Sequence, residues 1–241
     1  MAIIAGIHAV REALRARRPI ERVLIHAAER SSGRLREIVE MCHGAAVPVR
    51  QETREAIDRL AAGAVHQGVV AITAAGGYAD LAGILERLDH PGLLVALDGI
   101  EDPHNLGAII RTAHAAGADA VLIPERRAAG LTAAAAKAAA GALEYLPVAR
   151  VTNLNHALHD LKKRGFWVTG LDERGDKSYL GIDFRGPSVL LLGAEGHGLH
   201  QQARRCCDFL ASIPVAGRIA SLNVSVAAGI VLFEALRQRR G

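Results

Sequence analysis

The stretch Leu191-Leu-Gly-Ala-Glu-Gly-His-Gly-Leu199 decides which fold the second half of the chain is expected to adopt. An apolar segment here runs directly into glycines at positions 193, 196 and 198. Glycine lets backbone groups approach a ligand closely, so the turn is a candidate ligand site. Its order is GxxGxG, whereas the dinucleotide-binding fingerprint is GxGxxG and follows the first strand of its domain. The turn therefore argues against an ordinary dinucleotide-binding fold.

From residue 91 onward, apolar runs alternate with helical segments, which is the pattern of a parallel sheet covered by helices. Half of the residues are hydrophobic and only 3% are aromatic, so the core must rest on small and branched aliphatic side chains. We expect strands at 93–97, 120–123, 166–169, 188–192 and 211–213. Helices are expected at about 103–117, 131–141, 153–164, 200–206 and 222–238.

A smaller α/β module precedes this sheet domain. Its expected elements are a helix at 8–17, a strand at 22–26, a helix through Leu35 and Cys42 with Ser31 or Ser32 as cap, a strand at 47–50, a helix capped by Thr53, and a strand at 68–72. Residues 74–79 are small, polar or glycine-rich, which favours a linker. We expect an N-terminal domain over 1–75, a linker over 76–90 and a C-terminal domain over 91–241.

Composition limits the class of protein. The net charge is +4, and 25 of the 29 basic residues are Arg, whose planar fork suits phosphate, although a GC-rich genome would also favour Arg. The three cysteines show no CxxC spacing, so we expect reduced thiols and no zinc site. There is no apolar run of about 18 residues and no signal-peptide pattern at the start, so a cytoplasmic protein is expected.

Two further segments contain candidate functional residues. After the strand at 93–97, Asp102 and Pro103 predict a helix start, and Asn105 falls in the first turn with Arg111 off the apolar stripe. A capping Asn and a solvated Arg would be the ordinary explanation for that segment alone.

The last segment, Ile213–Glu234, opens a helix that is apolar on most sides and is expected to be nearly buried in the core or in a subunit interface. We expect Ser221 as its N-cap. Polar side chains in the first turn of a buried helix cost free energy unless they bind a ligand, and helix capping explains only Ser221. Glu195, inside the glycine turn, could orient a substrate or cap the next helix.

In combination, Asn105 with Arg111, GAEGHGL at 193–199, IP at 213–214 and SLNVSVA at 221–227 resemble the SpoU branch of the SPOUT RNA methyltransferases. The resemblance covers roughly 91–241. The first 75 residues, with Gly6-Ile-His-Ala9 and His66-Gln-Gly68, resemble the substrate-binding domain of bacterial members that methylate a guanosine ribose in the peptidyl-transferase P loop of 23S ribosomal RNA.

The resemblance implies a C-terminal domain with a deep trefoil knot near 193–225, and a homodimer with the final helix in its interface. It implies S-adenosylmethionine as cofactor, contacted by Gly193, Ile213 and Leu222. The substrate implied is 23S ribosomal RNA or a ribosomal large-subunit precursor. The catalytic set it implies is Arg111, as principal residue, together with Asn105, Glu195, Ser221 and Asn223. Because a guanidinium is a poor proton acceptor, our hypothesis is that Arg111 holds the adjacent phosphate and stabilises a developing alkoxide.

Three alternatives stay open at this point. A transfer-RNA guanosine 2′-O-methyltransferase, or another ribosomal RNA ribose methyltransferase, would share the C-terminal domain. A non-catalytic RNA-binding protein is disfavoured by the intact Arg111, Glu195 and Asn223. A nicotinamide-dependent enzyme is disfavoured by the late position of the glycine turn.

Overall fold

The computed structural model of the chain describes residues 2–16, 20–27, 33–73, 78–194, 196, 198–217 and 221–241. The chain divides into two compact units, Met1–Gly77 and Tyr78–Gly241. Within the described ranges, no helix combines the length and hydropathy needed to cross a membrane.

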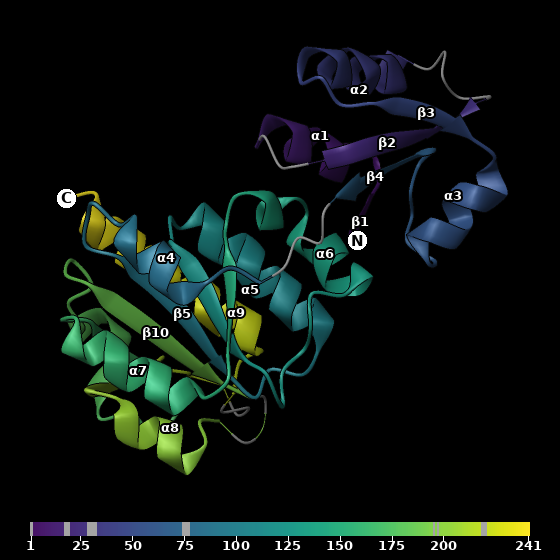
Figure 1. Cartoon of the computed structure of the whole chain (residues 1–241). Coiled ribbons are helices and arrows are strands. Elements are labelled where there is room, and N and C mark those ends of the chain that lie inside the picture. Colours follow the sequence, from purple (N-terminus) through teal and green to yellow (C-terminus); the bar gives the residue numbers. More distant parts are fainter. Residues whose placement is uncertain are drawn as a thin grey trace. The chain divides into compact units, whose positions relative to one another are not determined.

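The first unit is a four-stranded sheet with helices on both faces (Figure 1). Its strands, in spatial order, are β1 (Ala2–Ala5), β4 (Val69–Thr73), β2 (Ile20–His26) and β3 (Val49–Glu52), with only β2 and β3 parallel. One face packs on α1 (Ile7–Arg15) and α2 (Gly33–Gly44), and the other packs on α3 (Arg54–Ala61).

Most elements expected in this unit are present, with shifted ends. Thr53 is the N-cap of α3, because its Oγ1 accepts a 3.3 Å hydrogen bond from the amide of Ala56. Strand β1 was not predicted, and the caps expected at Ser31 or Ser32 lie outside the described residues.

The second unit contains a seven-stranded parallel sheet, which confirms the predicted fold class. In spatial order the strands are β7 (Val148–Val151), β6 (Ala120–Pro124), β5 (Leu93–Asp98), β10 (Ser188–Gly193), β8 (Trp167–Leu171), β11 (Phe209–Ser212) and β9 (Lys177–Ser178). Strands β7 and β9 were not predicted. The position of β10 between β5 and β8 places its glycine turn at the middle of the sheet's carboxyl edge.

Helices cover both faces of this sheet (Figure 1). One layer contains α5 (Pro103–Ala115), α6 (Ala133–Ala139) and α9 (Val224–Arg239). The opposite layer contains α4 (Leu81–Glu86), α7 (Leu154–Lys163) and α8 (Gln201–Cys206). Short 3₁₀ turns lie at η2 (Ala142–Glu144) and η3 (Tyr179–Gly181). Alternate side chains of β5 enter the two layers, which is the period of a strand buried on both faces.

Residues 78–90, expected as part of a linker, pack as part of the second unit instead. The amide of Ala79 donates to the carbonyl of Val148 at 2.8 Å, and the amide of Leu131 donates to the Tyr78 hydroxyl at 3.2 Å. Ile84 is only 4% exposed, so burial of its apolar side chain fixes α4 against the sheet.

The start of α9 also differs from expectation. Its N-cap is Asn223 and not Ser221, since the side-chain oxygen of Asn223 accepts from the amides of Ser225 at 2.9 Å and Val226 at 3.4 Å. In the single chain Val226 and Phe233 are half exposed, so the core does not bury the whole helix, and burial in a subunit interface stays a prediction. The predicted knot spans a region that includes residues outside the described part of the chain, and it stays a prediction.

Candidate active site

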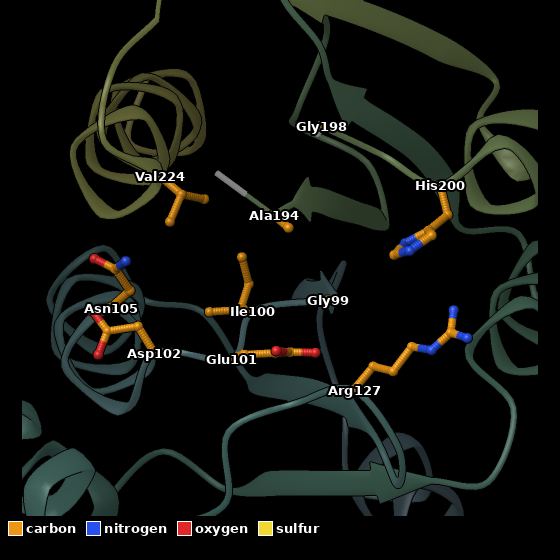
Figure 2. A pocket seen from close by; sticks show the side chains of 10 residues that line it. All are labelled: Gly99, Ile100, Glu101, Asp102, Asn105, Arg127, Ala194, Gly198, His200 and Val224. Carbon is orange, nitrogen blue, oxygen red and sulfur yellow. The ribbon is translucent and has the colours of Figure 1, made fainter. Parts of the chain in front are cut away.

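Two adjoining cavities lie at the carboxyl edge of the parallel sheet. The larger, of about 590 Å³, is lined by Gly99, Ile100, Glu101, Asp102, Asn105, Arg127, Ala194, Gly198, His200 and Val224 (Figure 2). The smaller, of about 160 Å³, lies between the ends of β8 and β10 and the start of α9. The two share Ala194, Gly198 and Val224, so molecules bound in them would be neighbours.

The smaller cavity brings together the three residues expected to contact a cofactor. Gly193, Ile213 and Leu222 all line it, and so does Ser221. A Cβ on Gly193 would lie 2.2 Å from the carbonyl carbon of Gly198, so no other residue type fits without displacing the backbone. The amide of Gly198 donates to the carbonyl of Ala194 at 2.9 Å, which closes the turn.

The remaining walls of the smaller cavity are mostly apolar and include one buried carboxylate, which the sequence analysis missed. Asp172 follows the end of β8, is 8% exposed at its side chain and pairs with Arg204 at 3.4 Å. Apolar walls suit a nucleobase, a carboxylate can accept from ribose hydroxyls, and close backbone approach suits the rest of a nucleoside. These residues fit S-adenosylmethionine. Glu195 and His197 lie outside the described residues.

At one end of the larger cavity lies Asn105, whose side chain is paired with a second amide, Asn223, that does not itself line the cavity. The side-chain nitrogen of Asn223 donates to the side-chain oxygen of Asn105 at 3.0 Å, and Asn105 is only 8% exposed. Asn223 itself is an exposed residue at the first turn of α9. The bond therefore fixes the first turn of α5 against that of α9, and two of the predicted site residues meet.

At the other end of the larger cavity lie three residues that the sequence analysis did not single out. Asp98 ends β5, and its carboxylate accepts from the His200 amide at 2.8 Å and lies 3.0 Å from Nδ1 of the same residue. Arg127 follows β6. Ligands of parallel sheets bind at strand carboxyl ends, and that rule applied to each predicted strand would have pointed to Asp98 and Arg127.

Among the predicted site residues that the structure describes, Arg111 lies apart from the others in a single chain. It is exposed on α5, six residues or about 9 Å along the helix axis from Asn105, and it lines neither cavity. Gly107, which lies between Asn105 and Arg111, allows α6 to pack closely on α5, because a Cβ there would lie 2.3 Å from the carbonyl oxygen of Ala135.

The parallel sheet carries two adjoining cavities at its carboxyl edge, one that fits a nucleoside and one that is polar. This arrangement defines a class of α/β enzymes that bring a nucleoside cofactor to a second substrate. Residues 92–233 match the model of the SpoU rRNA Methylase family. Residues 3–79 match the model described as RNA 2′-O ribose methyltransferase substrate binding. The chain belongs to the SpoU rRNA methylase family, which confirms the predicted resemblance.

Curated relatives match along nearly the whole chain. The 23S rRNA (guanosine-2′-O-)-methyltransferase RlmB of Pseudomonas aeruginosa is 46% identical over 98% of this chain and 96% of that protein. The RlmB of Ralstonia nicotianae is 42% identical over 98% of this chain and 96% of that protein.

Solved structures agree in fold. The SpoU methyltransferase AviRb of Streptomyces viridochromogenes, in complex with AdoMet, superposes with a TM-score of 0.82 at 29% identity, covering 99% of this chain and 90% of that chain. An AdoMet-bound rRNA methyltransferase from Sinorhizobium meliloti gives a TM-score of 0.78 at 29% identity, covering 98% of this chain and 86% of that chain.

Proposed function

We propose that this protein transfers the methyl group of S-adenosylmethionine to the ribose 2′-hydroxyl of a guanosine in the peptidyl-transferase P loop of 23S ribosomal RNA. The observation that carries the proposal is the shared wall of the two cavities, in a chain 46% identical along 98% of its length to a 23S rRNA (guanosine-2′-O-)-methyltransferase. That wall allows a nucleoside cofactor and a ribose to lie in contact.

In the smaller cavity, Gly193, Ile213 and Leu222 would hold the cofactor. When bound, S-adenosylmethionine supplies an electrophilic methyl group. Gly193 contributes by having no side chain, because its backbone can then lie against the ligand. The apolar side chains of Ile213 and Leu222 exclude water from the reacting groups.

Asn105, which lines the larger cavity and is hydrogen-bonded to Asn223, would orient the target ribose, together with Glu195 and with Ser221 of the smaller cavity. For the transfer, these residues would hold the ribose oxygen in line with the methyl group that the cofactor supplies, and the hydroxyl proton would leave to an acceptor such as water. Such an in-line displacement gains most of its rate from positioning, which a fixed pair of amides provides.

Arg111 would hold the phosphate adjacent to the target ribose and stabilise negative charge on the attacking oxygen. A guanidinium keeps its protons in proteins, so it acts as a donor and not as the base. Arg111 lies outside both cavities of a single chain. Its role therefore requires a second copy of the chain or the bound RNA to bring a target ribose within its reach.

The protein is proposed to act as a homodimer through α9. Val226 and Phe233 are 52% and 50% exposed and lie seven residues apart, on one side of the helix. A second copy would cover this apolar stripe. Sedimentation equilibrium should give twice the chain mass of 25.4 kDa, and Phe233→Asp should give the monomer. A monomeric wild-type protein would rule the homodimer out.

The test of the function is transfer of a labelled methyl group to 23S rRNA fragments, followed by mapping of the modified ribose. We expect one methylated guanosine in the P-loop fragment and no label in transfer RNA. Label in transfer RNA alone would replace this proposal with a transfer-RNA methyltransferase. We expect the reaction to take place in the cytoplasm, on 23S rRNA or a precursor of the large ribosomal subunit.

A further inference from the structure

We propose that Arg127 and His200 form a phosphate-binding site in the larger cavity, which holds the RNA backbone beside the ribose that is methylated. The inference rests on the proposed function and deepens it, because it assigns RNA-binding residues within the catalytic domain. Both side chains line the cavity and extend toward one another at one of its ends, while Asn105 and Val224 lie at the other (Figure 2).

Arg127 presents a cation to this cavity. It is exposed, and within the described part of the chain no hydrogen bond or ion pair engages its guanidinium. Its backbone φ is +56°, a left-handed conformation that is uncommon for a long side chain. Of the other non-glycine residues described with positive φ, Ala62 and Ala140 simply end helices. At Arg127 there is no helix end to explain it, and strained residues concentrate at functional sites.

Hydrogen bonds on either side fix the backbone of this loop. The amide of Glu125 donates to the carbonyl of Val151 at 2.9 Å. The amide of Ala129 donates to the carbonyl of Ile100, which itself lines the cavity, at 2.7 Å. The strained residue is therefore held between two anchored neighbours, and the loop is built to present the Arg127 side chain.

His200 is positioned from the opposite side of the cavity. The Asp98 carboxylate accepts from its amide at 2.8 Å and lies 3.0 Å from its Nδ1 atom, so the ring is held at two points. With Nδ1 directed to Asp98, the Nε2 edge is the one available to a ligand. Gly99 makes room for the ring, because a Cβ there would lie 3.1 Å from its Cε1 atom.

Two carboxylates also line the cavity and must be weighed against an anion. Asp102 accepts from the amide of His104 at 2.9 Å and lies beside Asn105, at the far end (Figure 2). Glu101 lies between the two ends, and no ion pair joins it to Arg127 in the described part of the chain. A third carboxylate, Asp98, lies at the end formed by Arg127 and His200, but it is paired with His200 and does not line the cavity. The side chains that face the cavity at this end are therefore donors, which suits a phosphate.

Arg127→Gly is the sharpest test, because glycine adopts positive φ without strain and the variant should fold. We expect its KM for a 23S P-loop fragment to rise about tenfold, as for one lost charged hydrogen bond, with kcat within about twofold of wild type. Affinity for S-adenosylmethionine, measured by calorimetry, should not change. Arg126→Gly is the matched control: it removes the same charge one residue away, outside the cavity lining, and its KM should stay within about twofold.

The salt dependence of KM separates a phosphate contact from a structural effect. Loss of one phosphate contact should lower the slope of log KM against log salt by about 0.7 in Arg127→Gly only. His200→Ala should also raise KM. The KM of the double variant should increase by less than the product of the two single-variant increases, because both residues hold the same group. Glu101→Gln should leave KM unchanged or lower.

Equal KM values for Arg127→Gly and Arg126→Gly would overturn the proposal, as would a rise for Glu101→Gln that matches Arg127→Gly. Failure of the wild-type protein to methylate the fragment would instead refute the proposed function. In that case the same variants are compared by fluorescence anisotropy with the same labelled RNA, and an unchanged affinity of Arg127→Gly would then overturn this inference separately.

Discussion

Asn223 and Asn105 are joined by a 3.0 Å hydrogen bond between their side chains, although 118 positions separate them in the sequence. The side-chain oxygen of Asn223 simultaneously caps α9 by accepting from the amides of Ser225 and Val226. The side chain of Asn223 therefore caps a helix with its oxygen and orients Asn105, which lines the larger cavity, with its nitrogen.

Replacing Asn223 should affect stability and catalysis together. Asn223→Ala removes the cap of α9 and should lower the free energy of unfolding by about 1 kcal/mol, as measured by urea denaturation. It should lower kcat/KM for RNA at least about tenfold, because Asn105 loses its partner. Asn153→Ala is the control, since Asn153 caps α7 through a 3.1 Å bond from the amide of His156, away from both cavities. If the control lost as much activity, the effect of Asn223 would be one of stability alone.

Gly193→Ala should abolish cofactor binding. The added Cβ would lie within 2.4 Å of three backbone atoms of Gly198 and Leu199, so the turn must open. We expect affinity for S-adenosylmethionine to fall at least about a hundredfold in calorimetry. Gly186→Ala provides the comparison, because a Cβ there meets nothing within 4 Å. Normal affinity in Gly193→Ala would show that the cofactor binds elsewhere.

Arg111→Lys should separate charge from geometry. Lysine keeps the positive charge but lacks the planar fork that grips a phosphate at two points. We expect kcat to fall by roughly a hundredfold in single-turnover methylation, with cofactor affinity unchanged because Arg111 lies outside the smaller cavity. Near-normal turnover would show that a guanidinium is not needed for the reaction.

Glu234 should make part of the stability depend on pH. Hydrogen bonds from Arg237 and Gln238, each of 2.8 Å, lower the pKa of its carboxyl from 4.5 to about 2. A lowered pKa stabilises the fold above pH 4.5, and this contribution disappears as the pH falls through about 2. Glu234→Gln should cost about 1 kcal/mol at pH 7, because Arg237 is largely exposed.

The measurement for Glu234 is the free energy of unfolding in urea across pH 2 to 7. The difference between wild type and Glu234→Gln should shrink toward pH 2, whereas Glu86→Gln, at an exposed position, should differ little from wild type at any pH. A difference independent of pH would mean that packing, and not charge, is responsible.

The central strands were predictable because burial on both faces leaves near-continuous apolar runs, as in Leu93–Asp98 and Ser188–Gly193. Edge strands were missed for the opposite reason. Strand β9 has two residues, both exposed, and β7 has only two buried positions among four. Local pattern also favoured Ser221 as a cap, whereas Asn223 holds that position because its side chain also reaches α5.

The residues that we propose to contact the cofactor could be predicted to lie together, since Gly193, Ile213 and Leu222 belong to recognisable motifs and line one cavity. The residues at the other end of the larger cavity share no motif: the strand-end rule points to Asp98 and Arg127 one by one, but not to their grouping with His200. The three residues lie close together because β6, β5 and β10 are neighbours in the sheet, and that order results from pairing between strands far apart in the sequence. Arg111 is the opposite case: it belongs to a recognisable motif, yet it lies outside the cavity that a single chain forms.

The insertion of β10 between β5 and β8 has a consequence during translation. The ribosome completes β5 and β8 well before β10, and Val224, which forms part of the wall of both cavities, is made later still. The cavity proposed to hold the methyl donor is incomplete until almost all of the chain has been synthesised. Cofactor binding therefore cannot stabilise the fold of a shorter nascent chain. A product terminated before Val224 would therefore lack part of the wall of both cavities.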